Sequence, residues 1–320
     1  MLRHLLGAAM LVWLVASLVF VLSRLAPGDP VTLVVAPGAS AAELAAARER
    51  LGLAAPLAVQ YAAWARSVLS GDLGASIATG QPVVRVLADA LPISLALGGV
   101  SLLLSFALGL TVGWWQARRR GTASDTTATV VATTFASAPA FWLALAAIAL
   151  FTYGAATLGF PAWLRLPAFG LRSPALGAGE SGLGDVVRHA VLPVLVLALV
   201  GAAGIARYGR SAFLDVLRLD LVRAARGRGV GRRQVALHVV RVALPTLLVL
   251  FALALPGVIA GSVFVETIFA WPGMGRAMVA AIAARDYPVV LGGTLLYAAM
   301  VIVANLAADL TLPLVDPRIR

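Results

Sequence analysis

Six long apolar runs, separated by polar segments, dominate the chain. They cover residues 5–22, 92–115, 126–153, 189–206, 243–265 and 288–308. A helix needs roughly 20 apolar residues to cross a bilayer, and backbone polar groups in lipid must be satisfied within the segment itself. The pattern therefore predicts an all-α, polytopic membrane protein with six transmembrane helices, the third interrupted by Pro139.

The first run follows Arg3 and His4, which makes a cleaved signal peptide the competing interpretation. The run is longer than a usual signal core, and Ser23-Arg24-Leu25 lacks the small residues of a cleavage site. We therefore expect an uncleaved membrane span.

A polar stretch after the first run, extending to Asp89, carries helix punctuation. Ser40 and Glu43 form a capping box, and Gly52 is a plausible helix stop. Residues 61–69 predict a second short helix that ends at Ser70-Gly71. A disordered linker would contain less Leu and Ala, so these features predict a small folded cap.

Composition and charge fix the environment of the chain. The chain is 61% hydrophobic with a mean hydropathy of +0.95, and its net charge of +11 comes from arginine alone. Most arginines flank the spans on the face that holds both termini and residues 207–241. The positive-inside rule places that face in the cytoplasm and the cap outside. Nucleic-acid binding is disfavoured because no aromatic-interleaved basic groove accompanies the charge.

Two small-residue patterns lie inside the spans. Gly109 and Gly113 form one, and Gly257 and Gly261 form the other. Such spacing allows two helix backbones to approach closely in a membrane. Glycine is common in this chain, so close packing and chance remain equally open interpretations.

The chemistry absent from the spans narrows the function. None of the six spans contains an Asp, Glu, Lys or Arg in its interior, whereas ion-coupled transporters usually place such groups near the midplane. No phosphate-binding Gly-x-x-x-x-Gly-Lys loop is present, so we expect ATP to bind elsewhere. A channel would need a filter loop or charged ring, and neither is evident.

Enzyme and metal interpretations are weak. Gly182-Leu-Gly-Asp185 matches the Gly-x-Gly-Asp pattern of intramembrane aspartyl proteases, but a second aspartate within a span is missing. His4, His189 and His238 lie far apart beside span ends, and the chain has no cysteine. We expect no catalytic residue, no metal site and no cofactor on this chain.

The segment of residues 219–230 is basic and rich in Ala and Gly between two apolar runs. Its arginines would be costly in lipid, so the segment must lie in water beside the membrane. Small side chains beside fixed positive charge suit close approach by another protein. We therefore expect a soluble partner to dock here.

This segment carries a family resemblance. Ala224-Ala-Arg-Gly-Arg-Gly229, followed by Leu244-Pro245, resembles the Glu-Ala-Ala-x-x-x-Gly…Leu-Pro motif of ABC importer permeases. In that family the motif forms a coupling helix that docks on the ATPase subunit, and here an arginine replaces its glutamate. The resemblance implies an ATPase-coupling site formed by Arg223, Ala224, Ala225, Arg226, Arg228 and Gly229. Flanking Arg232 and Arg233 could also pair with the ATPase or with lipid phosphates.

Five further motifs resemble the dipeptide, oligopeptide and nickel permeases of this family. They are Leu25-Ala-Pro-Gly-Asp-Pro30, Gly71-Asp-Leu-Gly74, Glu266-Thr-Ile-Phe-Ala-Trp-Pro-Gly-Met-Gly-Arg276, Arg285-Asp-Tyr-Pro-Val-Val290 and Asp316-Pro-Arg-Ile-Arg320. The resemblance implies outer-gate candidates Glu266, Trp271, Pro272, Gly273, Gly275, Arg285 and Asp286. An interfacial turn at Trp271 and a solvated Arg285–Asp286 pair are the alternatives.

The resemblance also implies an organisation. It indicates a type I importer permease with a transmembrane helix and periplasmic cap in residues 1–90, a core in residues 91–312 and a cytoplasmic tail in residues 313–320. It implies an inner-membrane complex with a second homologous permease, two ABC ATPases that bind ATP and Mg, and a periplasmic or lipid-anchored solute-binding protein. The substrate stays open among dipeptides, oligopeptides, nickel chelates and other solutes. An ion-coupled secondary transporter and a non-transporting membrane scaffold are the alternatives.

Overall fold

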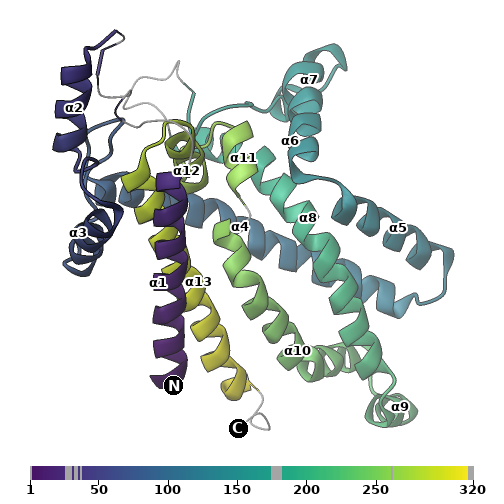
Figure 1. The fold of residues 1–320 in the computed structure, drawn as a ribbon. Coiled ribbons are helices and arrows are strands. Elements are labelled where there is room, and N and C mark those ends of the chain that lie inside the picture. Colours follow the sequence, from purple (N-terminus) through teal and green to yellow (C-terminus); the bar gives the residue numbers. More distant parts are fainter. Residues whose placement is uncertain are drawn as a thin grey trace. The chain divides into compact units, whose positions relative to one another are not determined.

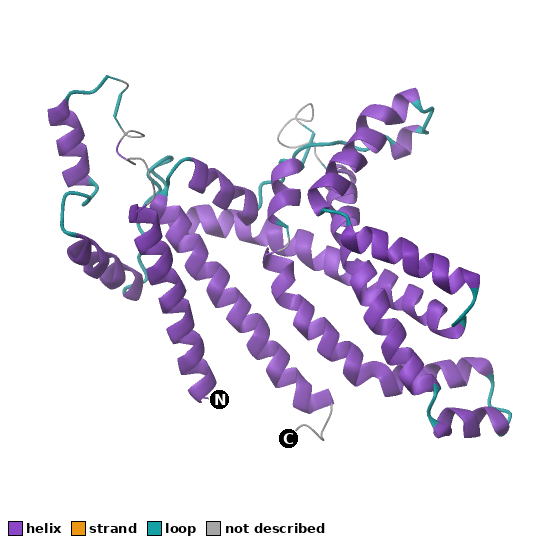
Figure 2. Cartoon of the chain, turned by 45° about the vertical axis from the view of Figure 1, so that its right-hand side comes forward, coloured by secondary structure: helices purple, strands orange, loops and turns teal. Residues whose placement is uncertain are grey.

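The computed structural model describes residues 2–25, 31, 35–36, 38–173, 182–260 and 262–315. These residues form helices joined by turns, with one isolated β-bridge between Ala75 and Pro82 and no strand among them (Figure 2). The all-α prediction is confirmed. Most of the Leu25–Pro30 motif, Gly261 and the terminal Asp316–Arg320 motif lie outside the described residues.

Five described helical segments are long and apolar enough to cross a membrane. They are Val83–Arg118, Ala140–Thr157, Leu183–Leu217, Arg232–Val258 and Tyr287–Ala307. A shorter apolar stretch, Ala9–Leu25, belongs to α1 (Leu2–Leu25), which covers the first predicted span. The polytopic prediction is confirmed, and the count of six remains a prediction.

The third predicted span is broken where the sequence places Pro139. Helix α5 (Ala123–Ser137) ends before Ala138, whose backbone is extended, and α6 (Ala140–Ile148) begins after the proline. Proline disfavours a helical conformation in the residue before it, which explains the break. A π-helical turn (Ala149–Tyr153) and α7 (Gly154–Thr157) then continue α6.

The fifth predicted span needs correction. Helix α10 runs from Arg232 to Ala260, so it begins in the basic segment and ends before the predicted limit at residue 265. A separate short helix, α11 (Val263–Ile268), follows Ser262. The apolar run thus continues through the break, and hydropathy alone could not reveal it.

The chain divides into two compact units. One comprises Met1–Ser94 and Pro272–Ile302, and the other comprises Leu95–Trp271 and Val303–Arg320. Helices α4 (Val83–Arg118) and α13 (Tyr287–Val315) contribute to both units.

The first unit contains the predicted cap. Helix α2 (Ala41–Arg50) begins with the predicted capping box, in which Ser40 and Glu43 bond to each other's backbone N–H groups, and Gly52 follows it with φ +66°. Helix α3 (Leu57–Leu69) ends at Ser70, as predicted, although it begins four residues before residue 61. Both short helices are confirmed.

Aromatic side chains hold α3 against α1. The rings of Trp13 and Phe20 on α1 lie 5.6 and 5.1 Å from the ring of Trp64 on α3. The hydroxyls of Ser17 and Tyr61 lie 2.7 Å apart and complete the contact. Elsewhere in this unit, the start of α4 packs on α12 (Met274–Ala283) and α13 through a cluster of Val83, Leu87, Ala90, Met274, Met278, Ala281 and Val289.

The second unit is built around α8 (Leu183–Leu217), with α5 and α6 packed along it (Figure 1). One apolar cluster joins α6, α8 and α11 through Ala144, Ile148, Leu166, Ala168, Leu192, Val196, Val265 and Phe269. The described part of the 154–185 loop contributes to this cluster. Thr152 Oγ1 donates to Leu166 O at 2.8 Å, and Gly170 N donates to Phe269 O at 2.8 Å.

The first glycine pair marks a close helix crossing between α4 and α8. A Cβ added at Gly109 would lie 2.7 Å from Ile205 Cβ, and one at Gly113 would lie 2.7 Å from Ala206 O. The close-packing interpretation is therefore correct for this pair. A Cβ at Gly257 would meet nothing within 4 Å, and Gly261 lies outside the described residues.

Replacing Gly113 with alanine should destabilise the protein. The new Cβ would meet backbone atoms of α8, which cannot move aside cheaply, and overpacking of this kind costs about 1–3 kcal/mol. Gly99→Ala is the matched control, because it lies on the same helix with nothing within 4 Å of its Cβ position. Thermal unfolding of the purified protein in detergent should show a lower midpoint for Gly113→Ala only. Equal midpoints would contradict the tight crossing.

Candidate functional site

The basic segment folds as a short helix, α9 (Asp220–Gly227), between α8 and α10 (Figure 1). Its N-cap is Leu219, which offers no side-chain hydrogen bond, while Asp220 places a negative charge in the first turn. A negative charge there favours the helix through the exposed N–H groups. The helical part of the coupling prediction is thus located at residues 220–227.

The end of α9 explains the glycine of the motif. Gly229 N donates to Arg226 O at 3.0 Å, and Val230 N donates to Ala225 O at 3.1 Å. This pair of bonds is the Schellman motif, which requires a left-handed residue after the helix cap. Gly229 takes that conformation, with φ +77°. The backbone conformation, and not a lack of space, calls for glycine here, since a Cβ at Gly229 would meet nothing within 4 Å.

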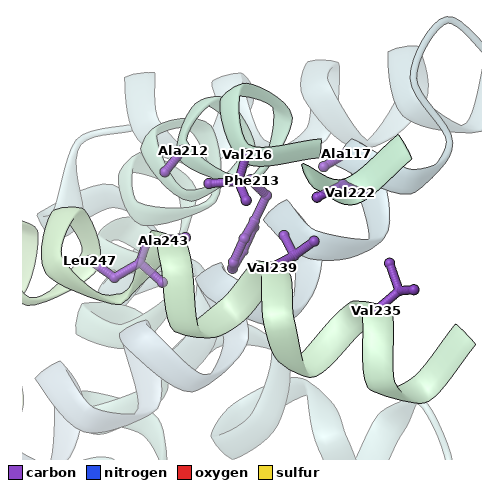
Figure 3. Close-up of a cluster of buried hydrophobic side chains, with 9 residues drawn as sticks. All are labelled: Ala117, Ala212, Phe213, Val216, Val222, Val235, Val239, Ala243 and Leu247. Carbon is purple, nitrogen blue, oxygen red and sulfur yellow. The ribbon is translucent and has the colours of Figure 1, made fainter. Parts of the chain in front are cut away.

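The inner face of α9 is anchored in an apolar cluster (Figure 3). Val222 is 1% exposed at its centre, and Ala225 and Val230 pack against the same cluster. The other members come from α4, α8 and α10: Ala117, Ala212, Phe213, Val216, Val235, Val239, Ala243 and Leu247. Val222 thereby connects α9 to the ends of three longer helices.

The outer face of α9 is open. The exposed residues include Arg223, Ala224, Arg226, Arg228 and Gly229, and Arg232 and Arg233 after them are exposed too. Arg223 pairs with Asp220 at 3.2 Å, but both side chains are so exposed that the pair adds little stability. Ala225 is half-buried and faces inward more than its neighbours do. This difference was not predicted from the sequence.

An ion pair between α5 and α8 lies close to this site. Arg210 Nε donates to Asp125 Oδ1 at 3.0 Å and Arg210 Nη2 to Asp125 Oδ2 at 2.8 Å. These bonds lower the pKa of the Asp125 carboxyl, which favours its charged form. Sequence analysis did not single out either residue. The only signal was that both charges sit just outside a predicted span on the same face.

The outer-gate candidates divide between the two units. In the second unit, Glu266 is fully buried and accepts a 2.6 Å hydrogen bond from Ser262 Oγ. Ala270, two residues after the end of α11, has φ +50°, and Trp271 N donates to Glu266 O at 2.7 Å. Trp271 is 4% exposed, and its indole nitrogen has no hydrogen-bond partner among the described residues.

In the first unit, Pro272 is exposed while Gly273 and Gly275 are buried at the start of α12. Met274 N, at the first position of that helix, donates to Ser94 Oγ at 2.8 Å. This bond satisfies the amide at the start of the helix, which has no acceptor within the helix itself.

Asp286 is buried, so the alternative of a solvated Arg285–Asp286 pair is wrong. Its carboxylate accepts hydrogen bonds from the Ser76 hydroxyl, from Ile77 N at 3.0 Å and from Ala78 N at 3.3 Å. Arg285 is exposed with φ +53°, which turns the chain so that Asp286 points inward. Asp286 therefore ties the turn at residues 76–79 to the α12–α13 connection.

The protease-like motif has a structural explanation. Asp185 accepts hydrogen bonds from Ser173 N at 2.8 Å and Ser173 Oγ at 2.7 Å, which close the loop before α8. His189 lies one turn later, with its Nδ1 3.5 Å from Asp185. Within the described ranges, no three His, Asp or Glu side chains gather as a metal site would require.

Two family descriptions match this sequence. Residues 109–320 match "Binding-protein-dependent transport system inner membrane component", and residues 1–98 match the N-terminal region of the same kind of membrane component. Together they cover the helices that form and anchor α9 as well as the cap.

Characterised relatives align with almost the whole chain. It is 38% identical to the di/tripeptide transport system permease protein DppB of Pseudomonas aeruginosa, over 96% of this chain and 94% of the relative. It is 37% identical to the oligopeptide transport system permease protein OppB of Mycobacterium tuberculosis, over 99% and 98%. It is 36% identical to the oligopeptide transport system permease protein AppB of Bacillus subtilis, over 95% and 94%.

These matches agree with the long apolar helices and the exposed basic segment between two of them. The chain belongs to the binding-protein-dependent transport system inner membrane components, the permease subunits of ABC importers, and is a multi-pass protein of the inner membrane.

Proposed function

We propose that this permease imports peptides or related small solutes, together with a second homologous permease that forms the other half of the pathway. A periplasmic or lipid-anchored binding protein delivers the solute, and two ABC ATPases supply the energy and bind ATP and Mg. The observation that carries the proposal is α9, a helix with a basic, small-residue outer face and a buried anchor at Val222.

The two faces of α9 suit the transmission of force. Arg226 and Arg228 offer guanidinium groups to acidic side chains of an ATPase, and Ala224 and Gly229 allow its backbone to approach closely. Val222 joins the helix to α4, α8 and α10 through packed side chains. A nucleotide-driven displacement of α9 would thus shift the population between inward- and outward-facing arrangements.

The orientation follows from charge. An ATPase is cytoplasmic, so α9 must face the cytoplasm, and the positive-inside rule places the same arginine-rich ends there. Both termini then lie in the cytoplasm, and α2 and α3 lie outside with the segment of residues 266–286. This arrangement is consistent with a cap that meets the binding protein.

The outer segment is our candidate for the external gate. The two non-glycine residues with positive φ in the described part of the chain, Ala270 and Arg285, both belong to it. Backbone strain of this kind costs about 1–3 kcal/mol per residue and often marks segments that move or bind. Glu266, Trp271, Gly273 and Asp286 are held by burial on either side of these bends.

The names of the relatives favour peptides as the solute class. DppB of Pseudomonas aeruginosa is named for di- and tripeptides and AppB of Bacillus subtilis for oligopeptides. The predicted spans carry no charged residue in their interior, which suits a pathway powered from outside the membrane.

Obstructing the outer face of α9 should uncouple the permease from its ATPases. Ala224→Trp places an indole where a partner backbone must approach, and Gly229→Val forbids the left-handed turn. We expect ATPase co-purification to fall about tenfold or more, equivalent to about 1.4 kcal/mol, with uptake lost in parallel. Ala224→Ser is the control and should behave as the wild type. Normal association and uptake in both bulky variants would refute the coupling assignment.

The energy source gives an independent test. In proteoliposomes that hold the full complex, peptide uptake should require ATP on the α9 side and continue after an uncoupler collapses the ion gradient. A secondary transporter would behave in the opposite way, with uptake that ignores ATP and stops with the gradient. A scaffold subunit would support no uptake in either condition.

Removing the Asp286 carboxylate should loosen the turn at residues 76–79. Asp286→Ala leaves two backbone N–H groups and the Ser76 hydroxyl without their acceptor, and each loss costs about 1–3 kcal/mol. We expect thermolysin cleavage before Ile77 to accelerate about tenfold or more and uptake to fall, with ATPase association unchanged. Asp89→Asn, which neutralises an exposed acid on α4, is the control. Unchanged cleavage would show that Asp286 does not hold the turn.

A further inference from the structure

The Asp125–Arg210 ion pair has the geometry of a rigid connection. Two parallel hydrogen bonds of 3.0 and 2.8 Å join the planar guanidinium to the planar carboxylate. The Asp125 side chain is 6% exposed and that of Arg210 is 30% exposed. A two-pronged contact of this kind fixes direction as well as distance. It joins the first turn of α5 to α8.

The same carboxylate also joins the end of α4 to α5. Gly121 N, in the α4–α5 turn, donates to Asp125 Oδ2 at 3.1 Å. Gln116, which is 2% exposed on α4, donates through Nε2 to Thr129 Oγ1 on α5 at 3.0 Å. Polar bonds of Asp125 and Gln116 thus hold α4, α5 and α8 together at this level.

This point adjoins the anchor of α9. The cluster that buries Val222 includes Ala212 and Phe213 of α8 and Ala117 of α4. Arg210 lies just before the first two on α8, and Gln116 lies just before Ala117 on α4. At the same level, Gly113 of α4 lies against the backbone of Arg210. A displacement of α9 therefore reaches the helix turns that hold Asp125.

Asp125 is the one buried side chain of α5, although this helix lies along α8. An apolar groove of about 810 Å³ lies along α4, α5 and α8. Its lining consists mainly of small or apolar side chains, including Gly109, Ala128, Ala132, Ala202 and Ala206. The ion pair therefore supplies the buried, directional contact at this end of α5.

We propose that Asp125 and Arg210 are positioning residues that make α5 move with α8 when the ATPases displace α9. The proposal rests on the proposed function and adds the route by which motion reaches α5. Because both hydrogen bonds must stay aligned, α5 and α8 shift together as one body through the transport cycle. Without the pair, α8 and α9 still respond to nucleotide, and α5 lags behind.

The first test measures uptake per ATP hydrolysed in proteoliposomes that contain the whole transporter. Asp125→Asn and Arg210→Met should lower this ratio about tenfold, while ATPase co-purification and nucleotide binding stay at wild-type levels. Asp215→Asn is the matched control, because it removes an exposed carboxylate from the same end of α8. A wild-type ratio in both variants would overturn the proposal.

A second measurement leaves the ion pair intact. The chain contains no cysteine, so Thr133→Cys on α5 and Arg207→Cys on α8 introduce its only two labelling sites, both exposed. The distance between spin labels should stay constant between nucleotide-free and ATP-bound complexes, and it should change when Asp125→Asn is added. A shift of several ångströms in the otherwise unaltered chain would overturn the proposal even if the single variants fail to assemble.

The proposed function stands or falls separately. If Ala224→Trp abolishes ATPase association while Asp125→Asn leaves uptake per ATP unchanged, only the positioning role is wrong. If Ala224→Trp leaves association intact, the assignment of α9 is wrong, whatever the ion-pair variants do.

Discussion

The rest of the proposed mechanism depends on the contact between Val222, on the inner face of α9, and the apolar cluster that buries it. An eight-residue helix is too short to be stable in water by itself. Here it is held by an apolar cluster on one side and by a Schellman motif at its end, which only a residue such as Gly229 can form without strain. These constraints leave the opposite face free for arginines and small residues. Residues 219–230 thus form a segment that is firmly attached on one face and open to a partner on the other.

The backbone device that closes α9 also closes α11 and α12, with different consequences. After α9 the left-handed position is a glycine, so the turn is relaxed. After α11 and α12 it is Ala270 and Arg285, whose Cβ atoms make that conformation costly by about 1–3 kcal/mol each. The burial of Trp271 and Asp286 directly after these residues compensates for the strain. Strain held by neighbouring burial is released when the neighbours separate, which suits a segment that opens and closes.

The sequence predicted much of this fold because the relevant signals are local. Apolar runs locate α4, α8 and α13, Pro139 locates the break between α5 and α6, and the capping box locates α2. Gly229 was identified through the family motif, and the structure shows that it provides a left-handed turn, which is also a local requirement. The end of α10 was placed wrongly because the chain stays apolar through the break. The burial of Asp286 and the Asp125–Arg210 pair could not be predicted, because their partners lie 210 and 85 residues away.

The cost of a partly buried ion pair argues that this one serves geometry. Taking a carboxylate and a guanidinium out of water is expensive, and well-packed apolar residues of similar size often stabilise a protein as much or more. The neighbouring crossing of α4 and α8 is indeed made by glycines, which obtain close contact without charge. Apolar contacts, however, have no preferred direction, whereas a two-pronged pair fixes both distance and direction. Asp125 is the one buried side chain of α5, and the rest of this helix lines an apolar groove, so the ion pair supplies the directional contact at this end of the helix.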